Sequence, residues 1–182
     1  MRSARRFVDQ CLLLLLILTL SSPSVRALDS NEYQIKAGFL LNFARFVEWP
    51  AEAFADDNAP IVIGLIGDDP FGGALDEIVS GKTINGRRLE IRRLKWGEDL
   101  KACHLLFVST SEKKRVVQLI DALKGGSVLT VGEMAQFNQL GGIISFVMEA
   151  NRVRFEINVP MADRARLRIS SKLLALARTT RK

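Results

Sequence analysis

The sequence contains few of the side chains that form disulfides, bind metals or act as catalytic bases. Its 182 residues include two cysteines and one histidine. A structural zinc site needs about four Cys, His or carboxylate ligands at convergent spacing, so we expect no metal site. Two cysteines also cannot form a framework of several disulfide bonds. The fold must therefore be stabilised by its core, and an apolar content of 48% makes this feasible.

The N-terminal segment has the three parts of a secretory signal peptide. A basic start (residues 2–6) precedes an apolar run (residues 11–20), and the small-residue site Val25-Arg26-Ala27 follows. The alternative is an uncleaved membrane anchor, which needs about 20 apolar residues. This run is shorter, and Pro23 follows it. We therefore expect secretion, cleavage after Ala27, and a single domain over residues 28–182.

The charge of the chain depends strongly on this segment. The whole chain has a formal net charge of +6, and residues 1–27 contain four arginines and one aspartate. The remaining residues carry a net charge of about +3. They show no basic face studded with aromatic side chains, which is typical of nucleic-acid-binding proteins. Nucleic acid is therefore not an expected partner.

Apolar runs and turn signals alternate along residues 28–182 in the order expected of an α/β protein. Asp29 or Ser30 can cap a first helix, which Trp49-Pro50 ends. The other expected helices cover residues 71–79, 98–102, 111–124, 134–140 and 162–177. The expected strands cover residues 61–66, 89–94, 105–108, 128–131, 143–148 and 153–157. These elements predict a mostly parallel central sheet flanked by helices, with a C-terminal antiparallel hairpin and a final helix.

Three features resemble parts of reactive or binding sites, but each has a simpler structural interpretation. His104 lies beside a buried strand, where we favour a hydrogen-bonded structural histidine over a catalytic base. Cys103 precedes the same strand, so a buried thiol is favoured over an intermolecular disulfide. Gly81-Lys82-Thr83 resembles the end of a phosphate-binding loop, but Asp76 replaces the first glycine and a helix replaces the preceding strand. We therefore expect no catalytic residues and no cofactor.

Two other segments have both a binding and a structural interpretation. The turn at residues 67–72 joins a buried strand to a helix, where α/β proteins often bind ligands. It is either a tight turn or a site for an anion or nucleotide. A group of arginines near the C-terminus forms either a binding surface or a solvated face, because arginine forks bind carboxylates and phosphates. These arginines are Arg152, Arg154, Arg164, Arg166 and Arg168.

Six segments spread over residues 28–182 resemble one family and keep its order. They are residues 32–37 (EYQIKA), 42–50 (NFARFVEWP), 67–72 (GDDPFG), 141–146 (GGIISF), 153–158 (VRFEIN) and 169–174 (ISSKLL). Together they are similar to the YfiR family of periplasmic proteins. No single short motif carries this resemblance, which makes it specific.

The resemblance implies an α/β homodimer in the periplasm that has no catalytic activity. It further implies a repressor that binds the periplasmic part of an inner-membrane diguanylate cyclase, a GGDEF-domain protein, and holds it inactive. An outer-membrane lipoprotein would sequester the repressor and release the cyclase. A stabilising disulfide of the best-known member is not carried over, because one cysteine remains after Ala27.

The C-terminal hairpin and the segment after it supply the candidate binding residues. A surface for a protein partner contains exposed apolar side chains, and strand alternation places Arg154 and Glu156 together, opposite Phe155. The apolar candidates have the sheet core as their alternative position. An alternative function is a periplasmic sensor that binds a small anion at the 67–72 turn or at the arginines. The candidates for partner or ligand binding are Phe146, Arg154, Phe155, Glu156, Ile157, Arg166 and Arg168.

Overall fold

The computed structural model describes residues 24–178, and it confirms the α/β class. Residues 1–23 of the predicted signal peptide lie outside the described part of the chain. The helices are α2 (Ser24–Phe46), α3 (Ala74–Val79), α4 (Val116–Ala122), α5 (Val159–Arg164) and α6 (Ser171–Leu176). The strands are β1 (Val47–Glu48), β2 (Ile61–Ile66), β3 (Thr83–Ile84), β4 (Arg87–Leu94), β5 (Leu105–Val108), β6 (Leu129–Gly132), β7 (Ile144–Glu149), β8 (Arg152–Ile157) and β9 (Arg168–Ile169). Short 3₁₀ turns occupy Ala51–Ala53, Leu100–Ala102 and Thr110–Glu112.

The main sheet has seven strands in the order β3-β4-β2-β5-β6-β7-β8. Strands β4, β2, β5, β6 and β7 are parallel, while β3 and β8 run antiparallel at the two edges. Every residue of β2 and β5 is buried. Central strands of a parallel sheet are covered on both faces, which explains their continuous apolar sequences. The hairpin of β7 and β8 pairs from Ile144↔Ile157 to Glu149↔Arg152, as predicted.

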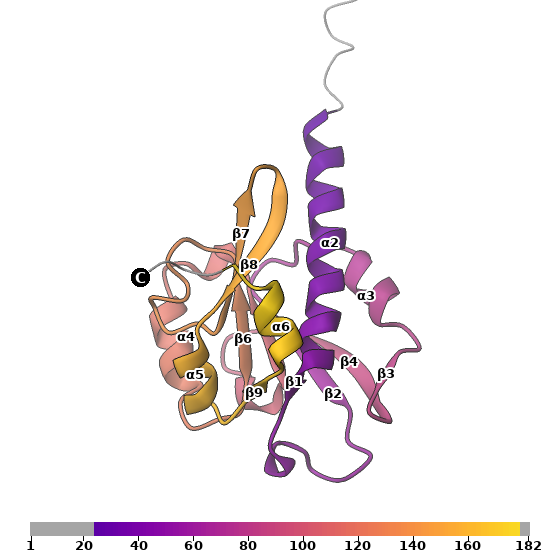
Figure 1. Cartoon of the computed structure of the whole chain (residues 1–182), viewed down its shortest axis with the longest axis vertical. Helices are drawn as coiled ribbons and strands as arrows, with labels where there is room; N and C mark the ends of the chain where they lie inside the picture. The colour runs from indigo at the N-terminus through magenta and orange to yellow at the C-terminus, as the bar shows by residue number, and fades with distance from the viewer. Residues whose placement is uncertain (1–23, 179–182) are drawn as a thin grey trace, which may run out of the picture. The chain divides into compact units, whose positions relative to one another are not determined.

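Helices cover both faces of this sheet. One core cluster joins Leu40 of α2, Leu75 of α3 and Phe107 of β5. The other joins Leu119 of α4 with Leu106 of β5. Leu106 and Phe107 are neighbours on one strand, so their side chains point to opposite faces. Figure 1 shows the resulting layers, with α4 on one side of the central strands and α3 on the other.

Four phenylalanines join α2 to the C-terminal hairpin. The ring of Phe43 lies 4.9 Å from that of Phe155 and 5.7 Å from that of Phe146. Phe39 contacts the same two rings at 5.4 Å and 6.1 Å. Tilted and edge-to-face rings at such distances attract one another beyond the effect of burial alone. Phe43, Phe155 and Phe146 are 0%, 2% and 3% exposed, so the cluster forms a dry core beneath the hairpin.

The predicted final helix is present, but its predicted extent, residues 162–177, is wrong. The structure has two short helices, α5 and α6, separated by β9, which pairs with β1. Arg166 adopts a φ of 58°, which takes the backbone out of the right-handed helical region. Ser170 then begins α6 as its cap, because its side chain accepts the N–H of Leu173. Leu167 and Leu173 enter the same core from separate elements.

The helix predicted over residues 134–140 is also wrong. This segment forms turns, closed by hydrogen bonds such as that from the Phe137 N–H to the Met134 carbonyl oxygen. The ring of Phe137 is fully buried and lies against Gly132 and Gly142, where an added Cβ would clash with it. Packing of this one ring therefore determines the path of the segment more than helical periodicity does.

The first helix begins earlier than predicted. It starts at Ser24, and not at Asp29 or Ser30. Residues 24–28 contain neither proline nor glycine, so nothing in their sequence interrupts a helix. Within residues 24–178, no helix combines the length and apolar character needed to cross a membrane.

Replacing Phe155 with alanine removes a ring from the dry core beneath the hairpin. We expect Phe155→Ala to lower the free energy of unfolding by about 3–5 kcal/mol, because apolar burial is lost and a cavity remains. Leu176→Ala is the matched control, since Leu176 is 64% exposed. The control should change stability by less than about 0.5 kcal/mol. Urea denaturation followed by circular dichroism measures both, and equal losses would contradict this assignment of the core.

Candidate functional site

The turn at residues 67–72 follows β2, and two of its backbone N–H groups donate to side chains of the protein itself. Gly67 has a φ of 89°, a conformation that glycine adopts readily. The N–H of Asp68 donates to Ser111 Oγ at 2.9 Å, and the N–H of Phe71 donates to Asp69 Oδ1 at 2.8 Å. An anion site needs such N–H groups to point at the ligand. These contacts favour the tight-turn interpretation.

Arg93 of β4 holds the same turn from the neighbouring strand. Its Nε donates to Asp69 Oδ2 at 2.8 Å, and its Nη2 donates to Asp76 Oδ2 at 2.6 Å. The hydrogen bonds from Arg93 lower the pKa of Asp76, and those to the two carboxylates raise the pKa of Arg93. The positive charge of Arg93 is thus already paired with two carboxylates, and these carboxylates would repel an incoming anion. An anion at this turn is therefore not favoured.

A buried polar cluster lies where β6 ends. Glu133 accepts hydrogen bonds from Tyr33 Oη at 3.0 Å and from Lys36 Nζ at 2.5 Å. Thr110, just after β5, donates to Glu133 Oε1 at 3.3 Å. Lys36 is 4% exposed, and its ammonium also lies 4.5 Å from the centre of the Tyr33 ring. A buried ion pair with these additional contacts positions α2 against the carboxyl ends of two central strands.

The sequence contained one signal for this cluster. Lys36 falls among the apolar positions Tyr33, Ala37 and Leu40 of the first helix, where a charged side chain must find a partner when buried. The partner lies 97 residues further along the chain. Local patterns do not identify pairs at such separation, so the sequence analysis missed both residues.

His104 has a structural environment. Its Nδ1 accepts the N–H of Val62 at 3.0 Å, and its Nε2 lies 3.1 Å from the carbonyl oxygen of Ala53. These contacts assign the neutral tautomer with the proton on Nε2. Burial lowers the pKa of His104 below its ordinary value. Both ring nitrogens are thus used to connect β2 with the Ala51–Ala53 turn.

Cys103 is a free, buried thiol in the part of the chain that the structure describes. It is 2% exposed, and burial raises its pKa to about 11. Gly64 of β2 leaves the space that it fills, since a Cβ on Gly64 would lie 2.6 Å from Cys103 Sγ. A thiol that remains protonated and buried is unreactive. This environment fits the buried-thiol interpretation.

The candidate residues of the hairpin separate into two groups. Phe146 and Phe155 belong to the dry core, and Ile157 is half-buried against it. These three side chains therefore pack in or against the sheet core, which was the alternative to an exposed partner surface. They do not offer an exposed apolar surface in this conformation. Arg154 is exposed and Glu156 half-buried on the opposite side of β8.

We call the side of the hairpin that carries Glu149, Arg152, Arg154 and Glu156 the hairpin outer face. Arg178, which follows α6, contacts it through Nε and Nη1, at 3.6 Å from Glu149 Oε1 and 3.7 Å from Glu156 Oε1. The N–H of Arg178 also donates to the carbonyl oxygen of the β8 residue Phe155 at 2.8 Å. The chain after α6 is therefore attached to the edge strand of the main sheet.

Exposed apolar side chains lie on the hairpin and on α6. Met148 of β7 is 52% exposed and points to the side of the hairpin opposite the outer face, because it pairs with Val153. Leu174 and Leu176 of α6 are 39% and 64% exposed. The Arg178 contacts bring the end of α6 to the hairpin, so charged and apolar groups are combined at this end of the sheet.

The predicted arginine group is distributed over several elements. Arg152 and Arg154 belong to β8, Arg164 ends α5, and Arg166 lies in the turn after it. Arg168 belongs to β9, in the separate two-stranded sheet. All five are exposed. The structure therefore does not gather them on one secondary-structure element.

Two comparisons relate this architecture to known proteins. Residues 33–178 match a family model described as YfiR/HmsC-like. The fold is also similar to a crystal structure described as a conserved domain protein from Vibrio cholerae O1 biovar El Tor str. N16961, with a TM-score of 0.53 and 12% sequence identity. That similarity covers 82% of this chain and spans 60% of the length of the Vibrio chain. At this identity it shows a shared fold alone.

The fold and its clusters define an α/β domain in which the Lys36–Glu133 pair and His104 hold separate elements in place. The family match is more specific, because it extends over nearly all the described residues. The chain belongs to the YfiR/HmsC-like family, as its sequence resemblance predicted. At the level of the family, this membership supports a periplasmic regulator of cyclic di-GMP signalling, in a family that is regulatory and not catalytic.

Protonation of His104 should oppose folding. Since burial lowers its pKa in the folded protein, the unfolded chain binds a proton more readily as the pH falls through about 6.5, the ordinary pKa of histidine. The free energy of unfolding should therefore decrease in this range. In His104→Asn, the Asn Oδ1 can accept the Val62 N–H but does not titrate, so this decrease should be smaller. Urea denaturation at several pH values between about 5 and 8 measures both slopes, and identical slopes would contradict the assignment.

The burial of Cys103 predicts slow reaction with thiol reagents. In the native protein at pH 8, the Cys103 peptide should remain unmodified by iodoacetamide while the same peptide in urea is fully alkylated, because the thiolate is the reactive form. Mass spectrometry after digestion distinguishes this peptide from the one that contains Cys11. Rapid alkylation of Cys103 in the native state would show that the thiol is accessible.

Proposed function

We propose that this protein is a periplasmic, non-enzymatic regulator that binds and inhibits an inner-membrane diguanylate cyclase. The match of residues 33–178 to the YfiR/HmsC-like family carries the proposal. The signal peptide exports the chain and is cut after Ala27, which leaves one domain outside the cytoplasm. The mature protein acts as a homodimer, and an outer-membrane lipoprotein sequesters it when the cyclase is to be released.

Inhibition of this kind needs no chemistry by the regulator. A protein that binds the inactive conformation of the cyclase more tightly than the active one shifts the cyclase toward inactivity. A tenfold preference corresponds to about 1.4 kcal/mol, which a few interface contacts can supply. The environments of His104 and Cys103 are consistent with such a role, because burial keeps the imidazole neutral and the thiol protonated.

We assign the partner surface to the hairpin end of the sheet. Arg154 on the hairpin outer face supplies charge, and Leu176 of α6 supplies exposed apolar area, as does Met148 on the other side of the hairpin. Interfaces combine an apolar centre with a polar rim, and arginine is enriched in them. Phe146, Phe155 and Ile157 support this surface from beneath. Arg166 and Arg168, exposed beyond α5, extend the set of charged candidates.

Deletion of the gene tests the regulatory direction. Loss of an inhibitor should raise intracellular cyclic di-GMP severalfold, as measured by mass spectrometry of cell extracts, and expression of the full chain should restore the original level. In the same strain, an affinity-tagged chain should co-purify a transmembrane GGDEF-domain protein from detergent extracts. Unchanged cyclic di-GMP together with no such protein in the purified fraction would refute the proposal.

Charge reversal tests the surface. Arg154→Glu should weaken co-purification of the cyclase by about tenfold or more, because a like charge then faces the partner. Lys82→Glu is the matched control: Lys82 is also exposed and precedes β3, at the opposite edge of the sheet from β8. Both variants should retain the circular dichroism spectrum of the unmodified protein. A loss of binding in Lys82→Glu but not in Arg154→Glu would place the partner elsewhere.

A further inference from the structure

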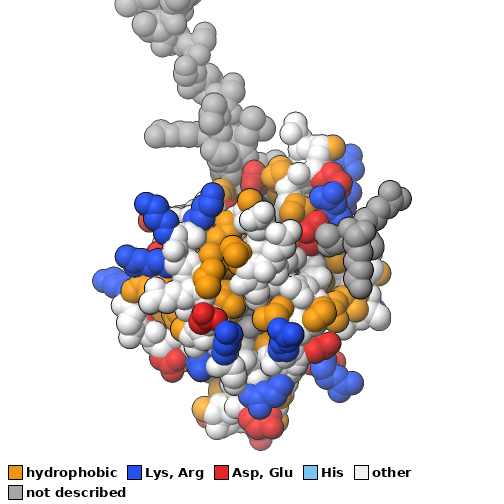
Figure 2. All heavy atoms as spheres, turned by 90° about the vertical axis from the view of Figure 1, so that its left-hand side faces the viewer, with side chains coloured by type: hydrophobic (Ala, Val, Ile, Leu, Met, Phe, Trp, Pro, Cys, Tyr) orange, Lys and Arg blue, Asp and Glu red, His pale blue; other side chains and the backbone are white. Residues whose placement is uncertain are grey.

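An apolar pocket of about 220 Å³ lies between α4 and α5, where β6 and β7 begin. Figure 2 shows the side of the protein that carries these helices, with apolar side chains gathered near its centre and Lys and Arg side chains around them. The pocket lies on neither the 67–72 turn nor the hairpin outer face. The sequence analysis did not predict it.

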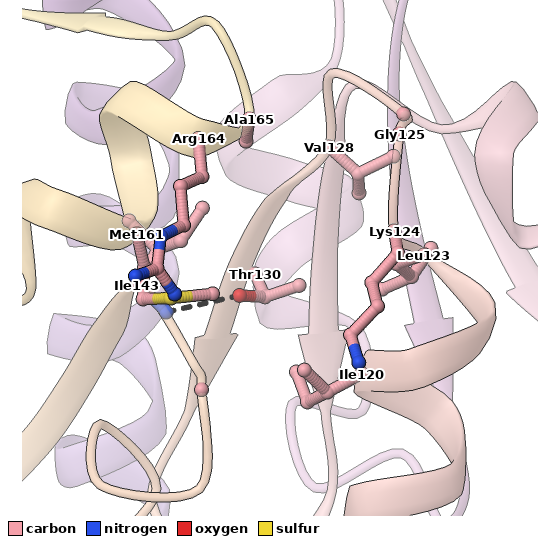
Figure 3. Close-up of a pocket in the computed structure, with 12 residues that line it drawn as sticks. Ile120, Leu123, Lys124, Gly125, Val128, Thr130, Ile143, Met161, Arg164 and Ala165 are labelled. Carbon is pink, nitrogen blue, oxygen red and sulfur yellow. Dashed lines mark hydrogen bonds between the residues drawn. The ribbon is translucent and has the colours of Figure 1, made fainter.

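The pocket lies where β6 extends past the start of β7. The two strands pair at Val131↔Ile144 and Gly132↔Ser145, and β7 begins at Ile144. Just ahead of this pairing, the N–H of Ile143 donates to Thr130 Oγ1 at 3.0 Å (Figure 3). Gly141 keeps the space open, since a Cβ there would lie 2.9 Å from Ile120 Cγ2. The cavity is therefore bounded by α4, α5 and the segments that lead into β6 and β7.

The lining has a specific chemical character. Its hydrophobic part is aliphatic, and the residues that line the pocket include neither an aromatic ring nor a carboxylate. A planar ring would thus find no ring to stack on, and a ligand ammonium would find no anionic partner. These properties select an uncharged alkyl chain for the interior. The aliphatic side chains are Ile120, Leu123, Val128, Ile143, Met161 and Ala165.

Two cationic side chains, Lys124 and Arg164, lie at the rim of the pocket, and they differ in their ion-pair partners. Lys124 Nζ is paired with Asp121 Oδ1 at 2.6 Å. The guanidinium of Arg164 extends toward Met161, whose Sδ accepts a weak hydrogen bond from Nη1 at 3.5 Å (Figure 3). Within residues 24–178, no carboxylate lies within ion-pair distance of Arg164. Its planar fork is thus available for a carboxylate presented from the pocket.

We propose that this pocket binds a medium-chain fatty carboxylate, with the alkyl chain among the aliphatic side chains and the carboxylate on Arg164. A cavity of about 150 Å³ accommodates benzene, so a pocket of this size has room for a chain of about eight carbons. Thr130 Oγ1 faces the same space and adds a polar group near the start of β7. This site goes beyond the regulatory function proposed above and does not require it.

Octanoate is the probe for a first test on the full-length protein. Isothermal titration calorimetry should show saturable binding with a Kd below about 1 mM. Octanol, which has the same chain without the charge, should bind at least about fivefold more weakly, because it cannot pair with Arg164. In ¹H–¹⁵N spectra, octanoate should shift the amides of Gly125, Thr130 and Gly141. Absence of saturable binding at several millimolar, or equal affinity for octanol, would overturn the proposal.

Three variants locate the site. Arg164→Gln should weaken octanoate binding by about fivefold or more, and Arg164→Lys should restore part of it. Ala165→Leu should abolish binding by filling the pocket, while the melting temperature reports whether the fold is retained. Arg88→Gln is the matched control, because Arg88 of β4 is exposed and outside the lining. Unchanged affinity in Arg164→Gln, or an equal loss in Arg88→Gln, would place octanoate elsewhere.

Discussion

The packing of Phe39 and Phe43 against Phe146 and Phe155 is the interaction on which the C-terminal half of the fold depends. A two-stranded hairpin alone is marginally stable in water, and β8 is an edge strand with no neighbour on its outer side in the sheet order. The rings of α2 give this hairpin a dry surface to pack on. Leu167 and Leu173 join the same core, so α5, β9 and α6 also take their positions from α2. One helix near the start of the chain thus organises its last third.

Several charged groups of this domain hold its elements together in pairs. Arg93 holds the 67–72 turn through Asp69 and Asp76, and Glu133 holds α2 through Lys36. The carboxyl edge of the sheet, where many α/β proteins bind ligands, is therefore occupied by structural contacts. The two binding sites that we propose lie instead at the hairpin end and near the starts of β6 and β7. This distribution suits a domain that responds to partners and small molecules at separate places.

The sequence predicted the features that local physics controls. Continuous apolar runs identified β2 and β5, and the spacing of two strands identified the hairpin. The extent of the final helix was predicted wrongly because Leu167 and Leu174 have helical spacing, while the left-handed turn at Arg166 has no strong local signal: arginine rarely adopts it. The Lys36–Glu133 pair and the pocket were missed for another reason. Both depend on how distant strands lie side by side, which no short window of sequence contains.

The pairing between β6 and β7 is short, and this has a consequence for folding dynamics. Two residue pairs and the Thr130 bridge connect these strands, whereas six pairs connect β7 to β8. Proteins open in cooperative units whose borders follow the weakest connections. The hairpin, with the short helices that share its core, forms such a unit, and the parallel strands β4, β2, β5 and β6 form another. Amide protons of the hairpin should exchange with solvent together, through an opening that leaves the parallel strands folded.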